Sequence, residues 1–185
     1  MKRIFLIGYM GSGKTTLGKA FAGKTTLGKA FARKLNIPFI DLDWYIEERF
    51  HKTVQELFAE RGENGFREIE RNMLHEVGDF EDVLIAAGGG TPCFFDNMDY
   101  MNSVGDTVFL DVNPEVLFRR LKIAKAKRPL LADKTDDELM NVITSALQKR
   151  MDFYRQAKYT FNAERLESYE QIGESVKKLK LLLDK

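Results

Sequence analysis

The strongest constraint on the fold is a glycine-rich segment, Gly8–Thr15, that directly follows a short apolar run, Arg3–Ile7. Its sequence, GYMGSGKT, matches the pattern GxxxxGK[ST]. Glycines in such a loop let backbone N–H groups face phosphate oxygens, and the N-terminus of a following helix adds a favourable dipole. Lys14 would reach the terminal phosphates, and Thr15 would bind Mg²⁺. The segment predicts a strand, a phosphate-binding loop and a helix, in that order.

Apolar runs of strand length alternate with helical patterns along the chain, which predicts an α/β fold with a parallel sheet. The expected strands are Arg3–Ile7, Phe39–Leu42, Val83–Ala87, Thr107–Val112 and Tyr159–Phe161. The expected helices are Lys14–Leu35, Trp44–Phe50, Val54–Arg61, Gly65–Val77, Pro114–Lys122, Asp136–Ala157 and Tyr169–Leu183.

The composition fits one domain over residues 1–185, with 44% hydrophobic residues for a core. A net charge of +1 argues against a nucleic-acid partner. Cys93 is the one cysteine, so no internal disulfide can form. No apolar run is long enough for a membrane span or a signal peptide. We therefore expect a cytoplasmic protein without membrane or nucleic-acid partners, and expect it to be a monomer.

Ten residues of the chain occur twice in succession. Gly13–Ala22 and Gly23–Ala32 both read GKTTLGKAFA, and nothing else in the chain repeats. A repeat architecture would need more and longer units, so we interpret this as a local tandem duplication of half a helix. It creates a second formal match to the phosphate-loop pattern, ending in Lys24 and Thr25, but Gly18 at its start follows a helical pattern instead of a strand.

Three further motifs have residue types that suit phosphoryl transfer. Asp41 and Asp43 end the second expected strand, where α/β proteins bind ligands, although strand-end acids can also be turn or helix-cap residues. Gly88–Gly90 follow the third strand and would let a ligand approach the backbone. A basic stretch from Arg119 to Arg128 could be a mobile cap that closes over phosphates, or an ordinary solvated loop.

Taken together, these motifs make the chain resemble the shikimate kinases over nearly its whole length, apart from the ten repeated residues. The resemblance rests on GYMGSGKTT, FIDLD, GENGFREIE, AAGGGT, RPLL and RMDFYRQA. It implies a three-layer P-loop NTPase fold with a five-stranded parallel sheet flanked by helices. It further implies a mobile lid at about residues 120–135 and an acceptor-binding helical region at about residues 43–78. The implied activity is transfer of the ATP γ-phosphoryl group to the 3-hydroxyl of shikimate, on the route to aromatic amino acids.

The resemblance also implies roles for individual residues. Catalysis would depend on Lys14, Asp43 and Arg128, and Mg²⁺ would be held by Thr15 and Asp41. ATP would be bound by Gly11, Ser12, Gly13, Lys14, Thr15, Thr16, Arg120 and Arg128. Shikimate would be bound by Asp43, Arg67, Gly88, Gly89, Gly90 and Arg150, with the two arginines clamping its carboxylate.

The repeat raises the question of which copy forms the phosphate site and the helix. Ten helical residues fall about 80° short of three turns, so one continuous helix would turn the wrong face to the sheet. Looping out one repeat length avoids this. Because a loop inside the phosphate cradle would be costly, we expect Lys14 and Thr15 to bind the nucleotide and the surplus residues to lie near the end of the helix.

Two other functions stay open at this point. The chain could be another small-molecule kinase of the same fold, acting on gluconate or a nucleotide, although Arg67 and Arg150 would then lack an evident joint purpose. Alternatively, it could be a nucleotide-binding chain that the duplication has inactivated.

Overall fold

The structure is a computed structural model that describes residues 2–14, 26–124 and 134–184. Five parallel strands form one sheet in the order β2-β3-β1-β4-β5. The strands are β1 (Arg3–Ile7), β2 (Phe39–Asp41), β3 (Val83–Ala86), β4 (Asp106–Asp111) and β5 (Tyr159–Asn162). The central strands are continuous apolar runs because both of their faces are covered.

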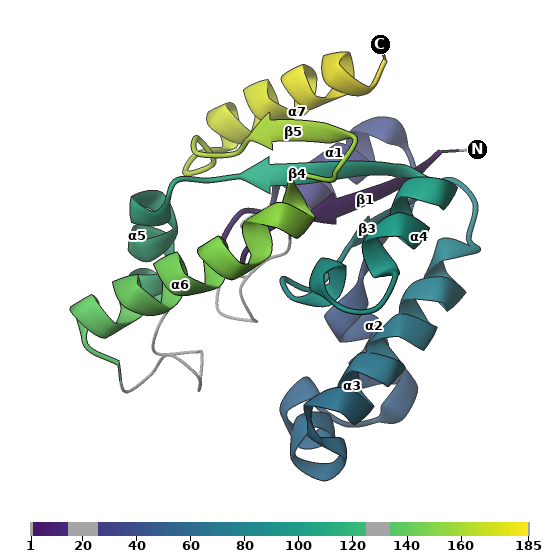
Figure 1. Cartoon of the computed structure of the whole chain (residues 1–185). Helices are drawn as coiled ribbons and strands as arrows, with labels where there is room; N and C mark the ends of the chain where they lie inside the picture. The colour runs from purple at the N-terminus through teal and green to yellow at the C-terminus, as the bar shows by residue number, and fades with distance from the viewer. Residues whose placement is uncertain (1, 15–25, 125–133, 185) are drawn as a thin grey trace.

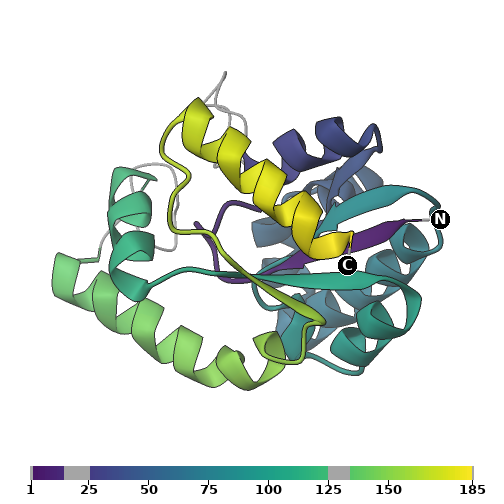
Figure 2. The same cartoon turned by 90° about the horizontal axis from the view of Figure 1, so that it is seen from above.

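Helices cover both faces of this sheet (Figure 1). One face is covered by α1 (Leu27–Leu35) and α7 (Tyr169–Leu183), which pack against each other. The other face is covered by α4 (Asn97–Val104) and α6 (Asp136–Tyr154), and α5 (Pro114–Ala124) packs on α6. Figure 2 shows α7 lying across the top of the sheet. This three-layer arrangement confirms the expected fold class.

Two further helices, α2 (Leu42–Phe50) and α3 (Val54–Gly78), pack against each other and extend beyond the β2 edge of the sheet (Figure 1). α3 begins with a capping box in which Thr53 and Glu56 satisfy each other's backbone N–H groups. Gly62 interrupts it with φ 68°, ψ −179°. The separate expectations of helices at Val54–Arg61 and Gly65–Val77 therefore correspond to the two arms of one kinked element.

The expectation for the repeat is wrong in one respect. The surplus residues do not lie near the end of the helix, because α1 runs without a break from Leu27 to a C-cap at Asn36. Asn36 adopts the left-handed conformation (φ 56°) and bonds to carbonyls of the last turn. The second copy is therefore the one joined to β2, and the expected helix Lys14–Leu35 is replaced by a shorter one.

Candidate active site

The phosphate loop leaves the carboxyl end of β1 as expected. Gly11 and Gly13 have φ values of 86° and 108°, which favour glycine. Lys14 is buried, with 7% of its surface exposed. Its Nζ donates to the carbonyl of Gly8, to that of Tyr9 at 2.9 Å, and to Ser12 Oγ at 3.4 Å. The ammonium group is thus held at the mouth of the loop.

Several residues expected at the nucleotide site lie outside the described part of the chain. They are Thr15, Thr16 and Arg128, and the residues of the second motif match, Lys24 and Thr25, also lie outside it. Arg120 is described, and four acceptors surround its guanidinium group: the carbonyls of Gly11, Ala163 and Glu164 and the carboxylate of Glu167. Arg120 therefore ties α5 to the phosphate loop and to the segment after β5.

Asp41 and Asp43 occupy different positions where β2 passes into α2. β2 ends at Asp41, one residue earlier than expected, because the Asp41 carboxylate caps α2 by accepting from Trp44 N–H at 3.1 Å. Asp43 lies in the first turn of α2 instead of at the strand end. The cap thus fixes where the Asp43 side chain leaves the helix.

Asp43 has an unusual electrostatic environment. More than a third of the Asp43 surface is exposed to solvent, yet many protein atoms lie around its carboxylate. Burial raises the pKa of Asp43 to about 7, with further contributions from the negative charges of Asp41 and Glu70, while Lys14 opposes the shift. A carboxylate with such a pKa can both accept and release a proton near neutral pH.

Each of the three glycines after β3, Gly88–Gly90, lies against a different charged group of the site. A Cβ on Gly88 would lie 3.0 Å from Asp43 Oδ1 and 2.9 Å from Glu70 Oε1. One on Gly89 would lie 3.3 Å from Arg150 Nη1. One on Gly90 would lie 2.8 Å from Arg67 Nη2. Glycine is needed here because any side chain would fill the space beside these charged groups.

Arg67 is held in place from α3 by a buried carboxylate. Its Nη1 donates to Glu70 Oε2 at 2.7 Å, and Glu70 is only 1% exposed. Thr91 donates its hydroxyl proton to the other Glu70 oxygen. The guanidinium lies over the ring of Phe94, 4.0 Å from its centroid. Among the described residues its buried Nε has no hydrogen-bond partner, and its Nη2 lies 3.5 Å from a carboxylate oxygen of Glu63.

Arg150 approaches the same glycines from α6. Its guanidinium lies 5.6 Å from the ring centroid of Tyr9, which belongs to the phosphate loop. One turn later on α6, Tyr154 is fully buried and donates to the Gly89 carbonyl at 2.6 Å. Burial raises the pKa of Tyr154 well above its usual value, so the phenol stays a donor. Tyr154 therefore fixes the distance between α6 and the glycine loop.

Sequence reasoning did not identify the residues that hold these arginines. Glu70 is three residues after Arg67 on one helix face, a spacing that could have indicated a pair. No comparable signal exists for Thr91 and Phe94, which are more than twenty residues from the groups they contact, or for the bond from Tyr154, one turn after Arg150, to Gly89.

The comparisons with known proteins agree with this geometry. A family model described as shikimate kinase matches residues 20–180. The shikimate kinase of Bacteroides thetaiotaomicron is 66% identical over 184 residues, covering 100% of this chain and 99% of the relative. That of Phocaeicola vulgatus is 65% identical over 185 residues, covering 100% of both chains. The chain belongs to the shikimate kinase family. It is therefore an ATP-dependent phosphotransferase, as the resemblance implied.

Solved structures of this family have the same fold. The 1.7 Å crystal structure of the Bacteroides thetaiotaomicron shikimate kinase matches with a TM-score of 0.92 at 65% identity, covering 100% of this chain and 99% of that one. The Acinetobacter baumannii shikimate kinase in complex with shikimate matches with a TM-score of 0.80 at 29% identity, covering 100% of this chain and 94% of that one. Within the described residues, no helix combines the length and the apolar character needed to cross a membrane.

Proposed function

We propose that this shikimate kinase family member transfers the γ-phosphoryl group of ATP to the 3-hydroxyl of shikimate, a step toward the aromatic amino acids. The observation that carries the proposal is the glycine loop after β3. Its three consecutive residues lie against Asp43, Arg150 and Arg67, while the phosphate loop passes beside Gly89, whose Cβ position is 3.6 Å from the Gly8 carbonyl. Acceptor groups and phosphate groups thus meet in one place.

Arg67 and Arg150 suit the carboxylate of the acceptor. Guanidinium groups form paired, charge-assisted hydrogen bonds with carboxylates, and both side chains are fixed by packing before a ligand binds. Buried Glu70 holds Arg67 through Nη1 at 2.7 Å, whereas the exposed Glu63 pairs with Nη2 only at 3.5 Å, so an acceptor carboxylate could replace Glu63 there. An acceptor without a carboxylate would leave this pair of arginines unused.

Asp43 suits the reacting hydroxyl. Its carboxylate can orient the hydroxyl and take its proton as the phosphoryl group arrives, because a base with a pKa near the working pH is effective in proton transfer. Lys14 can neutralise charge on the phosphates, and its positive charge partly offsets the rise in the pKa of Asp43. Most of the catalytic effect then comes from positioning and charge neutralisation.

Among the described residues, no three His, Cys, Asp or Glu side chains form a group that could hold a metal ion by themselves, so Mg²⁺ would be held by one or two protein groups together with the substrate phosphates. Asp41, Asp43 and Glu70 are close enough that the first and third raise the pKa of the second, so a divalent cation would relieve their mutual repulsion. Asp41, with Thr15, would hold Mg²⁺, whose part is to neutralise phosphate charge when bound. Asp41 still has one carboxylate oxygen beyond the one that caps α2.

The remaining assignments are also proposals. Residues of about 120–135 would form a lid in which Arg128 closes over the phosphates and Arg120 lies against the adenine. Residues of about 43–78 would form the acceptor-binding region. Gly11, Ser12 and Gly13 would complete the nucleotide contacts, and the protein would act as a cytoplasmic monomer.

A coupled assay of ADP release, with and without shikimate, tests the proposed function. We expect release to depend on both Mg²⁺ and shikimate. Dependence on gluconate or a nucleoside monophosphate instead would contradict the assigned acceptor. No release with any acceptor, in a folded protein that binds ATP, would favour the inactivated nucleotide-binding chain.

Replacing Arg150 by alanine is expected to weaken shikimate binding by about 10- to 150-fold, since one charge-assisted hydrogen bond contributes about 1.5–3 kcal/mol. ATP affinity should change much less. Calorimetry with each ligand measures both effects, and Arg155→Ala, an exposed residue just after α6, is the control. Equal losses for both ligands would remove Arg150 from the acceptor site.

Replacing Gly90 by alanine is expected to raise the KM for shikimate by about tenfold or more, the loss of about one charge-assisted hydrogen bond. The new Cβ would lie 2.8–3.2 Å from the Arg67 guanidinium, which Glu70 and Phe94 prevent from moving aside. Gly173→Ala on α7 is the control, because its Cβ would meet no atom within 4 Å. An unchanged KM would show that Arg67 can shift without consequence.

A further inference from the structure

The repeat leaves two identical candidates for every position in the helix after the phosphate loop, and the described contacts distinguish them. Thr26 caps α1, with its hydroxyl accepting from Lys29 N–H at 3.5 Å, and Leu27 and Phe31 are fully buried. All of these residues belong to the second copy. The second copy therefore occupies the one slot between the sheet and α7.

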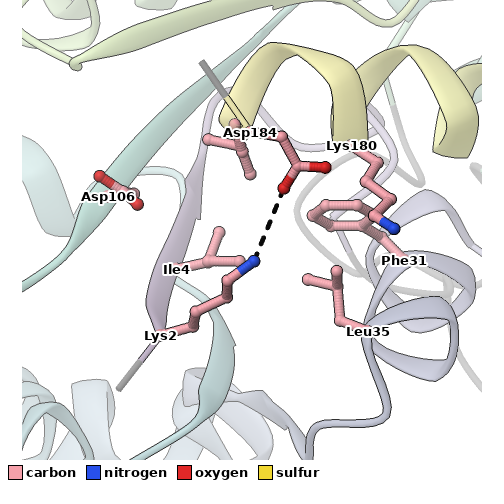
Figure 3. A pocket seen from close by; sticks show the side chains of 8 residues that line it. Lys2, Ile4, Phe31, Leu35, Asp106, Lys180 and Asp184 are labelled. Carbon is pink, nitrogen blue, oxygen red and sulfur yellow. Dashed lines mark ion pairs between the residues drawn. The ribbon is translucent and has the colours of Figure 1, made fainter.

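Figure 3 shows how this slot is filled. Phe31 and Leu35 on α1 lie beside Ile4 of β1 and Lys180 of α7, around a small pocket at the end of the sheet away from the glycine loop. Lys2 and Asp184, which also line it, form an ion pair at 3.6 Å. Phe31 fills the space between β1 and α7, so the second copy supplies the aromatic side chain of this slot.

The first copy nevertheless supplies the end of the phosphate loop. A Cβ on Gly28 would lie 2.5 Å from the Lys14 carbonyl oxygen, and one on Gly13 would lie 3.9 Å from Leu27 Cβ. In a helix, such neighbours are four residues apart. Here each pair is fourteen residues apart, one repeat length more. Lys14 therefore stands in space where Lys24 would stand if the second copy formed the whole motif.

We infer that the phosphate site is spliced across the repeat, with Lys14 from the first copy and the capping threonine Thr26 from the second acting on the same nucleotide. Thr26 then has the nucleotide-binding role that the sequence motif by itself assigns to its counterpart Thr16. The inference rests on the proposed ATP site. It differs from both simple alternatives, in which one copy supplies the lysine and the threonine together.

Physical reasons favour the splice over either alternative. Gly13 must follow Ser12 directly, because the loop conformation depends on positive φ at Gly11 and Gly13. At the other end, Phe31 and the Asn36 cap must remain on one continuous helix. Both demands are met only if the chain changes from the first copy to the second between Lys14 and Thr26, which keeps both sets of contacts.

Paired variants of the identical copies test the inference in the full chain. We expect Lys14→Ala and Thr26→Val each to weaken binding of Mg²⁺-ATP by about tenfold or more, as for the loss of one charge-assisted hydrogen bond. Their counterparts Lys24→Ala and Thr16→Val should change the affinity by less than about twofold, within ordinary surface effects. Titration calorimetry with Mg²⁺-ATP measures all four. Loss at Lys14 and Thr16 would assign the site to the first copy and overturn the splice, and loss at Lys24 and Thr26 would assign it to the second.

A ligand-free measurement separates this inference from the proposed function. Gly28→Ala should lower the Tm, because its Cβ would collide with the Lys14 carbonyl and the Phe39 ring at 2.5 and 2.8 Å, and Gly18→Ala should not. Equal Tm values for the two variants, or a lower Tm for Gly18→Ala, would overturn the splice whether or not the chain phosphorylates shikimate. Conversely, an inactive wild-type chain with the expected Tm pattern would contradict only the proposed function.

Discussion

Replacing Asp43 by asparagine is expected to lower the turnover number by about 10²- to 10⁴-fold, the usual contribution of a positioned general base. The amide keeps the shape of the carboxylate but can neither take the proton of the acceptor hydroxyl nor contribute negative charge. ATP affinity should be retained, because Lys14 and the phosphate loop are untouched. Steady-state kinetics and calorimetry measure the two effects, with the exposed Asp152→Asn as control. A near-normal turnover number would show that Asp43 is only a residue in the first turn of α2.

The pH dependence follows from the same group. Since the pKa of Asp43 in the free protein is raised to about 7, kcat/KM should increase as the pH rises through that value and level off above it. The rise in kcat should occur at lower pH than the rise in kcat/KM, because bound Mg²⁺ would add positive charge near the carboxylate and lower its pKa. A kcat/KM that is flat across this range would contradict the assignment of Asp43 as the base.

Asp43→Asn should also change stability, and the sign is fixed by linkage. A carboxyl whose pKa is higher in the folded protein than in the unfolded chain stabilises the fold least once the pH rises above the folded value. Without Mg²⁺ and nucleotide, the variant should therefore gain more stability over the wild type at about pH 8.5 than at about pH 5.5. Because Asp43 is partly exposed, solvent screening reduces the effect, and a Tm increase of about 2–4 °C is expected at the higher pH. Thermal unfolding at both pH values measures it.

The second large effect is expected at Phe31. Phe31→Ala should lower the free energy of unfolding by about 3–5 kcal/mol, the usual cost of emptying a buried aromatic site. Its identical counterpart Phe21→Ala should change it by less than about 0.5 kcal/mol, because the slot beside β1 is already filled. Urea unfolding of the two variants measures the difference, and both carry the same substitution in the same ten-residue sequence.

The more conservative substitutions Phe31→Leu and Phe21→Leu test the same expectation if the Phe31→Ala variant does not fold. Only the Phe31 variant should then lose stability, by about 1 kcal/mol. Equal losses of stability in the two variants would mean that either copy can occupy the slot between the sheet and α7.

Local sequence patterns were sufficient for most of the framework. All five strands were predicted within one residue at each end. For β1 and β3 the reason is that parallel strands buried on both faces are continuous apolar runs. The helix α4 was not predicted. Its segment, NMDYMNSV, is short and lacks a side-chain N-cap bond, and it is held by tertiary contacts such as the bond from Asn97 Nδ2 to the Thr91 carbonyl.

The sequence by itself determined the fold class, the family and which charged residues are candidates for the site. The phosphate-loop spacing and the residue types of the aspartates and arginines can be read directly from the sequence. Only the tertiary structure decided that three consecutive glycines separate Asp43, Arg150 and Arg67, and that buried Glu70 holds Arg67. It also decided how the repeat is used. Two identical segments have identical local preferences, so only contacts with β1, α7 and the Asn36 cap can favour one of them.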